Sequence, residues 1–151
     1  MPDEADRRIL RQLLADPDQP AARLAERAGV TPATLWRRLE KLRASGVIQR
    51  QEARIDWRKL GYEVEVSLRF TLDKTNPRAF DEFTAAAREV PEVIEIQTFL
   101  GSVDFRLSVI ARDMAHWQEI YRERILTLPH VEASDALMLV STIKNSVELP
   151  L

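Results

Sequence analysis

The segment from residue 21 to residue 44 constrains the fold most strongly, because its pattern fits two short helices joined by a tight turn. The first helix carries small and aliphatic residues on one face: Leu24, Ala25 and Ala28. Gly29 suits the left-handed conformation that often ends a helix. Thr31 is a favoured N-cap, and Pro32 suits the first turn of a second helix. A short turn with glycine is the geometry that lets a second helix lie in the DNA major groove.

The second of these helices, which we expect to end near Ala44, has two distinct faces. Taking ~100° per residue, the leucines share one face, toward the first helices: Leu35, Leu39 and Leu42. Polar and basic residues gather opposite: Thr34, Arg37, Arg38 and Lys41. Arginine and lysine pair with phosphates, and arginine also bonds guanine edges. Such charges usually lie on a solvated helix face, but the cap, the turn and the preceding helix together favour DNA.

We therefore predict a set of DNA-contacting residues in this region: Thr31, Pro32, Ala33, Thr34, Arg37, Arg38, Lys41 and Arg50. Trp36, beside the leucine face, is interpreted mainly as partial core packing. A contact from Trp36 to sugar or to a thymine methyl is the alternative.

The flanking segments complete a first domain, expected over residues 1–60. Asp3 and Asp6 precede an amphipathic helix that the proline-rich residues 16–20 end. Residues 47–56 are mostly polar with apolar ends and predict a two-stranded wing, or a wing and a connecting strand. Residues 1–60 hold thirteen basic and nine acidic residues, a net +4, whereas residues 61–151 carry −6. A basic first part makes a polyanion a candidate partner for it.

The remainder, residues 61–151, predicts a second domain with alternating strands and helices. The expected strands are 64–70, 93–99, 105–110 and 136–140, with helices starting near residues 76 and 113. The order β-α-β-β-α-β is the ferredoxin-like arrangement. The predicted fold class is therefore α+β, a winged helix-turn-helix followed by a ferredoxin-like domain. One face of such a sheet is left free for a partner, which predicts at least a dimer.

Several classes of protein are disfavoured. The chain has no cysteine, its acidic start does not resemble a secretory signal, and no apolar run reaches membrane-spanning length, so we expect a cytoplasmic protein. His116 and His130 are the two histidines, and neither belongs to a group with metal-ligand spacing. No glycine-rich phosphate loop is present. We predict no catalytic residue, no metal and no cofactor.

Short motifs follow one another in order along nearly the whole chain, including Leu24-Ala25-Glu26-Arg27-Ala28-Gly29-Val30-Thr31-Pro32, Gly46-Val47-Ile48, Lys59-Leu60-Gly61 and Val90-Pro91-Glu92-Val93, together with residues 3–10, 37–42, 101–104, 128–129 and 149–151. Through these motifs the chain resembles the Lrp/AsnC family of leucine-responsive, or feast/famine, regulators. The resemblance implies transcriptional regulation through double-stranded DNA, and a homodimer that assembles further, often to an octamer. Haem-pathway (sirohaem-type) decarboxylases have a similar two-domain architecture, and a protein of that type is the alternative to a regulator.

The resemblance also implies that an amino acid or related metabolite binds between second domains. It places this effector site at the turn between the two middle strands, where we predict contacts from Thr98, Leu100, Gly101, Ser102 and Asp104. Family members usually have Asp and Tyr where this chain has Ser102 and Val103, and small hydroxyl residues where it has Ala136 and Leu137. A free α-amino group favours a carboxylate, and only Asp104 remains near the turn. Weak or altered amino-acid selectivity is therefore expected. For Gly101, a plain tight turn is the alternative, and for Asp104 the alternative is a side chain that caps or solvates the turn.

Overall fold

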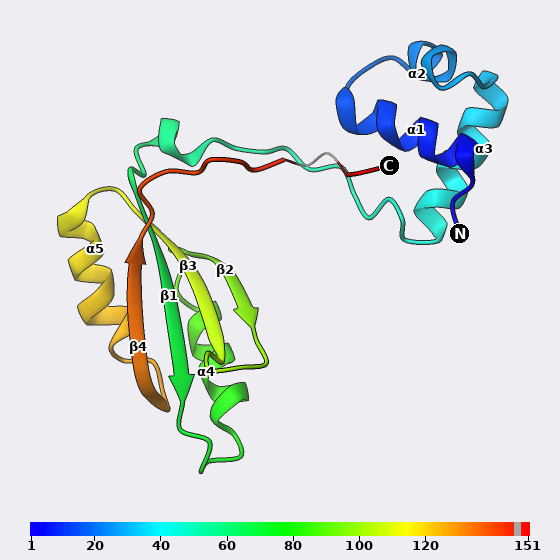
Figure 1. Cartoon of the computed structure of the whole chain (residues 1–151). Coiled ribbons are helices and arrows are strands. Elements are labelled where there is room, and N and C mark those ends of the chain that lie inside the picture. The colour runs from blue at the N-terminus through cyan, green and yellow to red at the C-terminus, as the bar shows by residue number, and fades with distance from the viewer. Residues whose placement is uncertain (147–148) are drawn as a thin grey trace. The chain divides into compact units, whose positions relative to one another are not determined.

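The computed structural model describes residues 1–146 and 149–151, and these form two compact units. The first unit holds residues 1–54 together with the described part of 143–151, and the second holds residues 55–142 (Figure 1). The sequence pattern had suggested a boundary near Gly61 and gave no sign that the last residues belong with the first helices. Each unit has its own apolar core.

Three helices build the first unit: α1 (Glu4–Ala15), α2 (Ala21–Ala28) and α3 (Pro32–Ala44). Asp3 caps α1 in a capping box, because its carboxylate accepts from the Asp6 N–H while that of Asp6 accepts from the Asp3 N–H. The apolar faces of the helices meet in one core: Ile9, Leu24, Ala25, Ala28, Leu35 and Leu39.

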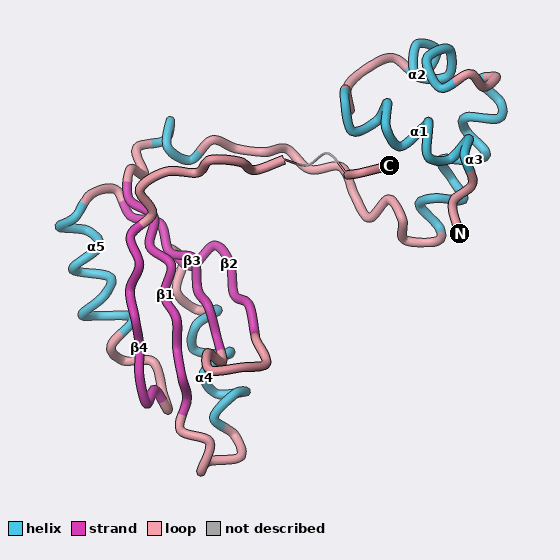
Figure 2. The backbone as a smooth tube through the Cα atoms, viewed as in Figure 1, coloured by secondary structure: helices cyan, strands magenta, loops and turns pink. Residues whose placement is uncertain are grey.

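The predicted wing strands are absent from the described chain. Residues 47–56 contain no strand and run as a loop (Figure 2). Apart from Ile48, whose N–H donates to Leu42 at 3.1 Å, these residues are exposed. No strand that the structure describes lies beside these residues, and their exposed backbone groups are open to solvent. A single 3₁₀ turn, η1 (Trp57–Leu60), then leads to Gly61.

The second unit contains a four-stranded antiparallel sheet in the order β2-β3-β1-β4. Its elements in chain order are β1 (Val64–Leu72), α4 (Ala79–Arg88), β2 (Val93–Thr98), β3 (Phe105–Ala111), α5 (Met114–Ile120), the π-turn η2 (Tyr121–Ile125) and β4 (Val131–Met138). This is the predicted ferredoxin-like order. β4 begins five residues earlier than predicted, because this edge strand is mostly exposed and lacks the apolar alternation that marks a half-buried strand.

Both helices of this unit pack on one face of the sheet. That face receives Val66, Leu68, Phe70 and Leu72 from β1, and the rings of Phe83 and Phe105 lie 4.7 Å apart between α4 and β3. Strand alternation directs Ser67, Arg69 and Thr71 to the opposite face, which the helices leave open.

Candidate nucleic-acid interface and ligand site

The turn between α2 and α3 sets the start of α3. Gly29 has φ +66°, and its N–H together with that of Val30 satisfies the last carbonyl groups of α2. The Thr31 hydroxyl then accepts from the Thr34 N–H at 3.2 Å, and Pro32 occupies the first turn of α3. Three of the predicted contact residues, Thr31, Pro32 and Thr34, therefore have local roles in forming the helix start.

α3 has a buried face and an open face. Leu35, Leu39 and Leu42 are at most 5 % exposed, as predicted. The open face consists of exposed residues: Ala33, Trp36, Arg37, Glu40, Lys41 and Arg43. Arg37 and Lys41 take part in no ion pair or hydrogen bond with any residue that the structure describes. Two cations without a partner among the described residues thus lie next to each other, on the face of α3 that is not packed against the rest of the unit.

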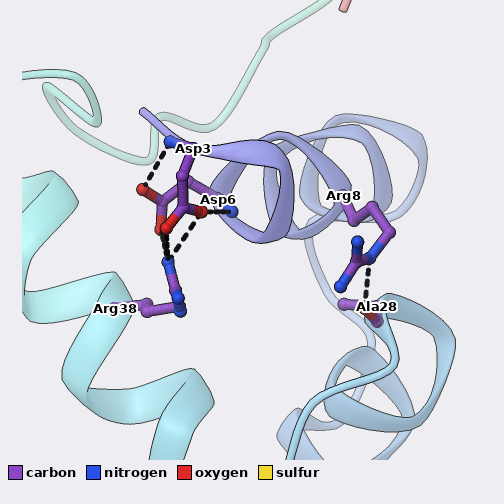
Figure 3. Close-up of polar contacts among 5 residues, drawn as sticks. All are labelled: Asp3, Asp6, Arg8, Ala28 and Arg38. Atoms are coloured by element: carbon purple, nitrogen blue, oxygen red, sulfur yellow. Dashed lines mark hydrogen bonds and ion pairs between the residues drawn. The ribbon is translucent and has the colours of Figure 1, made fainter. Parts of the chain in front are cut away.

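Arg38 lies on the flank of α3 and is bound by carboxylates. Its Nη1 atom lies 2.7 Å from Asp3 Oδ2 and 2.8 Å from Asp6 Oδ1 (Figure 3). The hydrogen bond from Arg38 is the largest of the effects that lower the pKa of Asp3 below its ordinary value. Asp6 is only 2 % exposed, so its charge requires such a partner. The predicted contact residue Arg38 therefore joins α3 to the start of α1.

Arg8 makes a second such connection, since its Nε atom donates to the carbonyl oxygen of Ala28 at 2.9 Å (Figure 3). This bond ties α1 to the end of α2, just before the turn.

The predicted contact residue Arg50 lies in the loop after α3 and pairs with Glu52 on the surface.

Two residues of the open face lie outside the predicted set of DNA contacts, although a DNA contact from Trp36 was the alternative interpretation. Trp36 is 53 % exposed and is not part of the core of the first unit. Glu40 lies one turn later and is also exposed. The 3.6-residue period placed Trp36 at the border of the leucine face, where a small rotation decides between core and solvent. Glu40 was not considered, because the prediction selected polar and basic residues that can bind DNA.

The predicted effector turn joins β2 to β3 and is fastened to the end of β1. Phe99 donates to the Asp104 carbonyl at 3.0 Å, Asp104 donates to Phe70 at 2.9 Å, and the Thr71 hydroxyl donates to Ser102 at 3.2 Å. Thr98, Leu100, Gly101 and Ser102 are exposed. Gly101 has φ +152°, which side-chain-bearing residues rarely adopt, so the backbone itself accounts for glycine here.

Asp104 is turned inward rather than toward a ligand. It is 4 % exposed; its Oδ2 atom accepts from the Leu72 N–H at 2.9 Å and its Oδ1 atom lies 3.0 Å from Lys74 Nζ. Burial raises the pKa of the Asp104 carboxyl, but the hydrogen bonds from Leu72 and Lys74 outweigh it, so the pKa lies below its ordinary value. Both oxygens of the carboxylate that was expected to hold an amino group are thus already bound.

A cavity of about 390 Å³ borders the same end of β1. Its wall combines apolar and polar residues: Phe70, Asp73, Ile125, Leu126, Leu128, His130, Val131 and Ser134. His130 has φ +61°, and its Nε2 atom lies 2.6 Å from Glu82 Oε2. Within the described residues, no three histidine, cysteine or acidic side chains are grouped to hold a metal.

Comparison with known proteins assigns both units. A model described as winged helix-turn-helix DNA-binding matches residues 2–49, and one described as the Lrp/AsnC ligand binding domain matches residues 65–149. The chain belongs to the Lrp/AsnC family. Members of the family that are similar over the whole length are transcriptional regulators, so this Lrp/AsnC protein is a regulator and not an enzyme of the decarboxylase type.

Several relatives can be named. The chain is 31 % identical to a proline dehydrogenase transcriptional activator from Rhodobacter capsulatus, covering 97 % of both chains. It is 28 % identical to the leucine-responsive regulatory protein of Salmonella typhimurium, covering 97 % of this chain and 90 % of that protein. An AsnC family regulator from Agrobacterium tumefaciens superposes with a TM-score of 0.87 at 30 % identity, covering 99 % and 97 % of the two chains.

A regulator from Neisseria meningitidis, solved as a complex with L-Met, shares the fold with a TM-score of 0.90 at 23 % identity, covering 99 % of this chain and 97 % of its own. In addition, none of the helices that the structure describes is long and apolar enough to cross a bilayer.

Proposed function

We propose that this Lrp/AsnC regulator reads double-stranded DNA with the open face of α3. The observation that carries the proposal is that Arg37 and Lys41 lie on that face one helical turn apart, without a partner among the described residues. α3 is the second helix of the helix-turn-helix, and Thr31 caps its first turn. Cations of this kind bind phosphates, and an arginine reaches guanine edges when its helix lies in the major groove. Ala33 lies on the same face, and Arg50 provides a phosphate contact from the following loop.

The supporting residues have different roles in this proposal. Arg38 positions α3 against α1 through Asp3 and Asp6 instead of touching DNA. Thr31, Pro32 and Thr34 hold the first turn of α3, and the helix N-terminus that they form is a favourable position for a DNA phosphate. The protein acts in the cytoplasm, with the DNA that it binds.

A small-molecule effector, an amino acid or related metabolite, is proposed to bind beside the β2–β3 turn. The exposed turn Thr98–Ser102 supports this region, and the 390 Å³ cavity lies at the same end of β1 but is lined by none of the turn residues. The Neisseria meningitidis regulator, which shares this fold, was solved with L-Met. Because Asp104 is already bound, the backbone of Gly101 and the Ser102 hydroxyl are the groups that meet the effector.

The regulator is proposed to form a homodimer that assembles further, to an octamer. The sheet face that the helices leave open supports this proposal, since it carries an exposed apolar side chain, Leu137 opposite Ser67, that a second copy would cover. A two-fold dimer also presents two copies of α3 to a palindromic operator.

Fluorescence anisotropy with an operator duplex tests the proposed DNA interface. Replacing both Arg37 and Lys41 with alanine should weaken binding and lower the salt dependence, because counterion release falls with each lost phosphate contact. The matched control removes two exposed arginines from the second unit, Arg122→Ala with Arg124→Ala, and should leave binding unchanged. Normal binding by a folded Arg37→Ala/Lys41→Ala variant would overturn the proposal.

A further inference from the structure

The open face of α3 carries an acid and an aromatic ring beside its two cations. Trp36 and Glu40 lie four residues apart, so they are neighbours on the helix surface. Trp36 is 53 % exposed. Glu40 makes no hydrogen bond or ion pair with any described residue, although Arg37 and Arg43 lie three residues to either side. Neither residue has a structural task that accounts for it.

An acid on this face should repel DNA unless it meets a hydrogen-bond donor. The phosphates are acceptors only, and a carboxylate near them costs affinity for every sequence. The major groove, however, presents the 4-amino group of cytosine, which a glutamate carboxylate accepts from. An exposed apolar ring on the same helix face fits the other distinctive feature of the groove, the 5-methyl group of thymine.

We propose that Trp36 and Glu40 are specificity-determining residues that read bases, while Arg37 and Lys41 supply affinity. Glu40 accepts a hydrogen bond from the 4-amino group of a cytosine, and Trp36 packs against the methyl group of a nearby thymine. This inference rests on the proposed placement of α3 in the major groove. It assigns opposite effects to neighbouring residues, since loss of a cation weakens all binding, whereas loss of Glu40 strengthens non-specific binding and weakens discrimination.

The first experiment compares the wild-type chain with Glu40→Met by selection from a random-sequence duplex library. The variant keeps the length of the side chain and removes both its charge and its acceptor oxygens. It should bind unrelated DNA more tightly and lose the preference for cytosine at one position of each half-site, reducing discrimination there by about 5- to 150-fold. Asp18→Asn removes the same charge from an exposed loop of the same unit and should leave the selected sequence unchanged.

The second experiment pairs a protein change with a DNA change. Replacing one thymine of the selected site with uracil removes only the 5-methyl group. The wild type should lose several-fold affinity at one thymine, and Trp36→Ala should bind the thymine and uracil sites equally. For Glu40, 2-pyrimidinone in place of cytosine removes the 4-amino group, and the Glu40→Met variant, whose side chain has no acceptor oxygen, should no longer respond to that replacement.

The outcomes separate this inference from the proposed function. An unchanged selected sequence for Glu40→Met, or a Trp36→Ala variant that still distinguishes thymine from uracil, overturns the base-reading roles. If Arg37→Ala/Lys41→Ala abolishes binding in the same assay, α3 remains the DNA interface and only the reading residues are refuted. If that double variant binds normally, the placement of α3 itself is refuted, and the inference with it.

Discussion

Arg38 and Asp104 are both charged side chains that sit next to a proposed binding surface, yet both are bound inside their own unit. Arg38 contacts Asp3 and the buried Asp6, and Asp104 contacts Lys74 and the Leu72 N–H. A buried charge is costly unless it is paired and hydrogen-bonded. These contacts assign both residues to stability, and that assignment can be tested.

Replacing Asp104 with alanine should lower the free energy of unfolding by roughly 1–3 kcal/mol, because the Leu72 N–H would be buried without an acceptor. Urea denaturation of the full chain measures this. Effector affinity, measured by calorimetry with amino acids, should not change. A stable variant that has lost effector binding would show instead that Asp104 is a ligand.

The pH dependence of that effect has a definite sign. The folded-state pKa of Asp104 lies below its ordinary value of 3.8, so ionised Asp104 stabilises the fold at every pH above that value. This stability is lost as the pH falls through the lowered folded-state pKa. The difference in unfolding free energy between wild type and Asp104→Asn should therefore be constant near neutrality and shrink below pH 3.8. A difference that grows on acidification would contradict the assigned contacts.

Arg38→Ala and Lys41→Ala should have different effects, the first on stability and the second on the salt dependence of DNA binding. The first leaves the carboxylate of Asp6 without its cation, so the urea midpoint of the variant should fall while the salt dependence of DNA binding by folded protein stays the same. The second should leave the midpoint unchanged and reduce the salt slope by about one. Equal salt slopes for Lys41→Ala and the wild type would remove Lys41 from the interface.

At the scale of elements, the turn between α2 and α3 depends on the left-handed conformation of Gly29. A Cβ atom there would meet open space, so a substitution carries only the conformational cost. Gly29→Ala should destabilise the full chain by roughly 1–2 kcal/mol and weaken DNA binding through the misplaced start of α3. Thermal unfolding checks the first effect and anisotropy the second. An unchanged unfolding temperature would mean that the turn adapts without strain.

The elements that could be predicted from sequence are those with local signals. Thr31, Pro32 and Gly29 mark helix ends by their own chemistry, and the alternation in residues 64–70 follows burial on one side of the sheet. The start of β4 at Val131 could not be predicted, since an exposed edge strand needs no apolar pattern. The prediction of wing strands was wrong for a related reason, because strand pairing depends on a partner strand that local sequence does not reveal.

The same limit applies to the candidate site. Helical periodicity assigned Arg37 and Lys41 to the open face correctly, but the partners of Arg38 lie 32 and 35 residues away in sequence. The inward turn of Asp104 likewise depends on Leu72 and Lys74, some thirty residues earlier. Residue type alone indicated charge, and only the fold shows whether that charge is free.

At the scale of the whole molecule, assembly should depend on the open face of the sheet. Leu137 pairs with Ser67 on that face and is 38 % exposed. Leu137→Glu would place a charge in the proposed interface, so light scattering at micromolar concentration should show a shift toward monomer. Met114→Glu, at a 47 % exposed position in α5, is the matched control and should not alter the mass. A monomeric wild type would refute the assembly.

The central claim is that this Lrp/AsnC regulator recognises specific DNA through α3. Genome-wide recovery of bound DNA, from cells expressing wild type or Arg37→Ala/Lys41→Ala at equal levels, tests it most directly. Wild type should recover a limited set of sites that share one two-fold-symmetric motif, and the double variant should lose them all. Recovery of the same sites by both proteins would contradict the account.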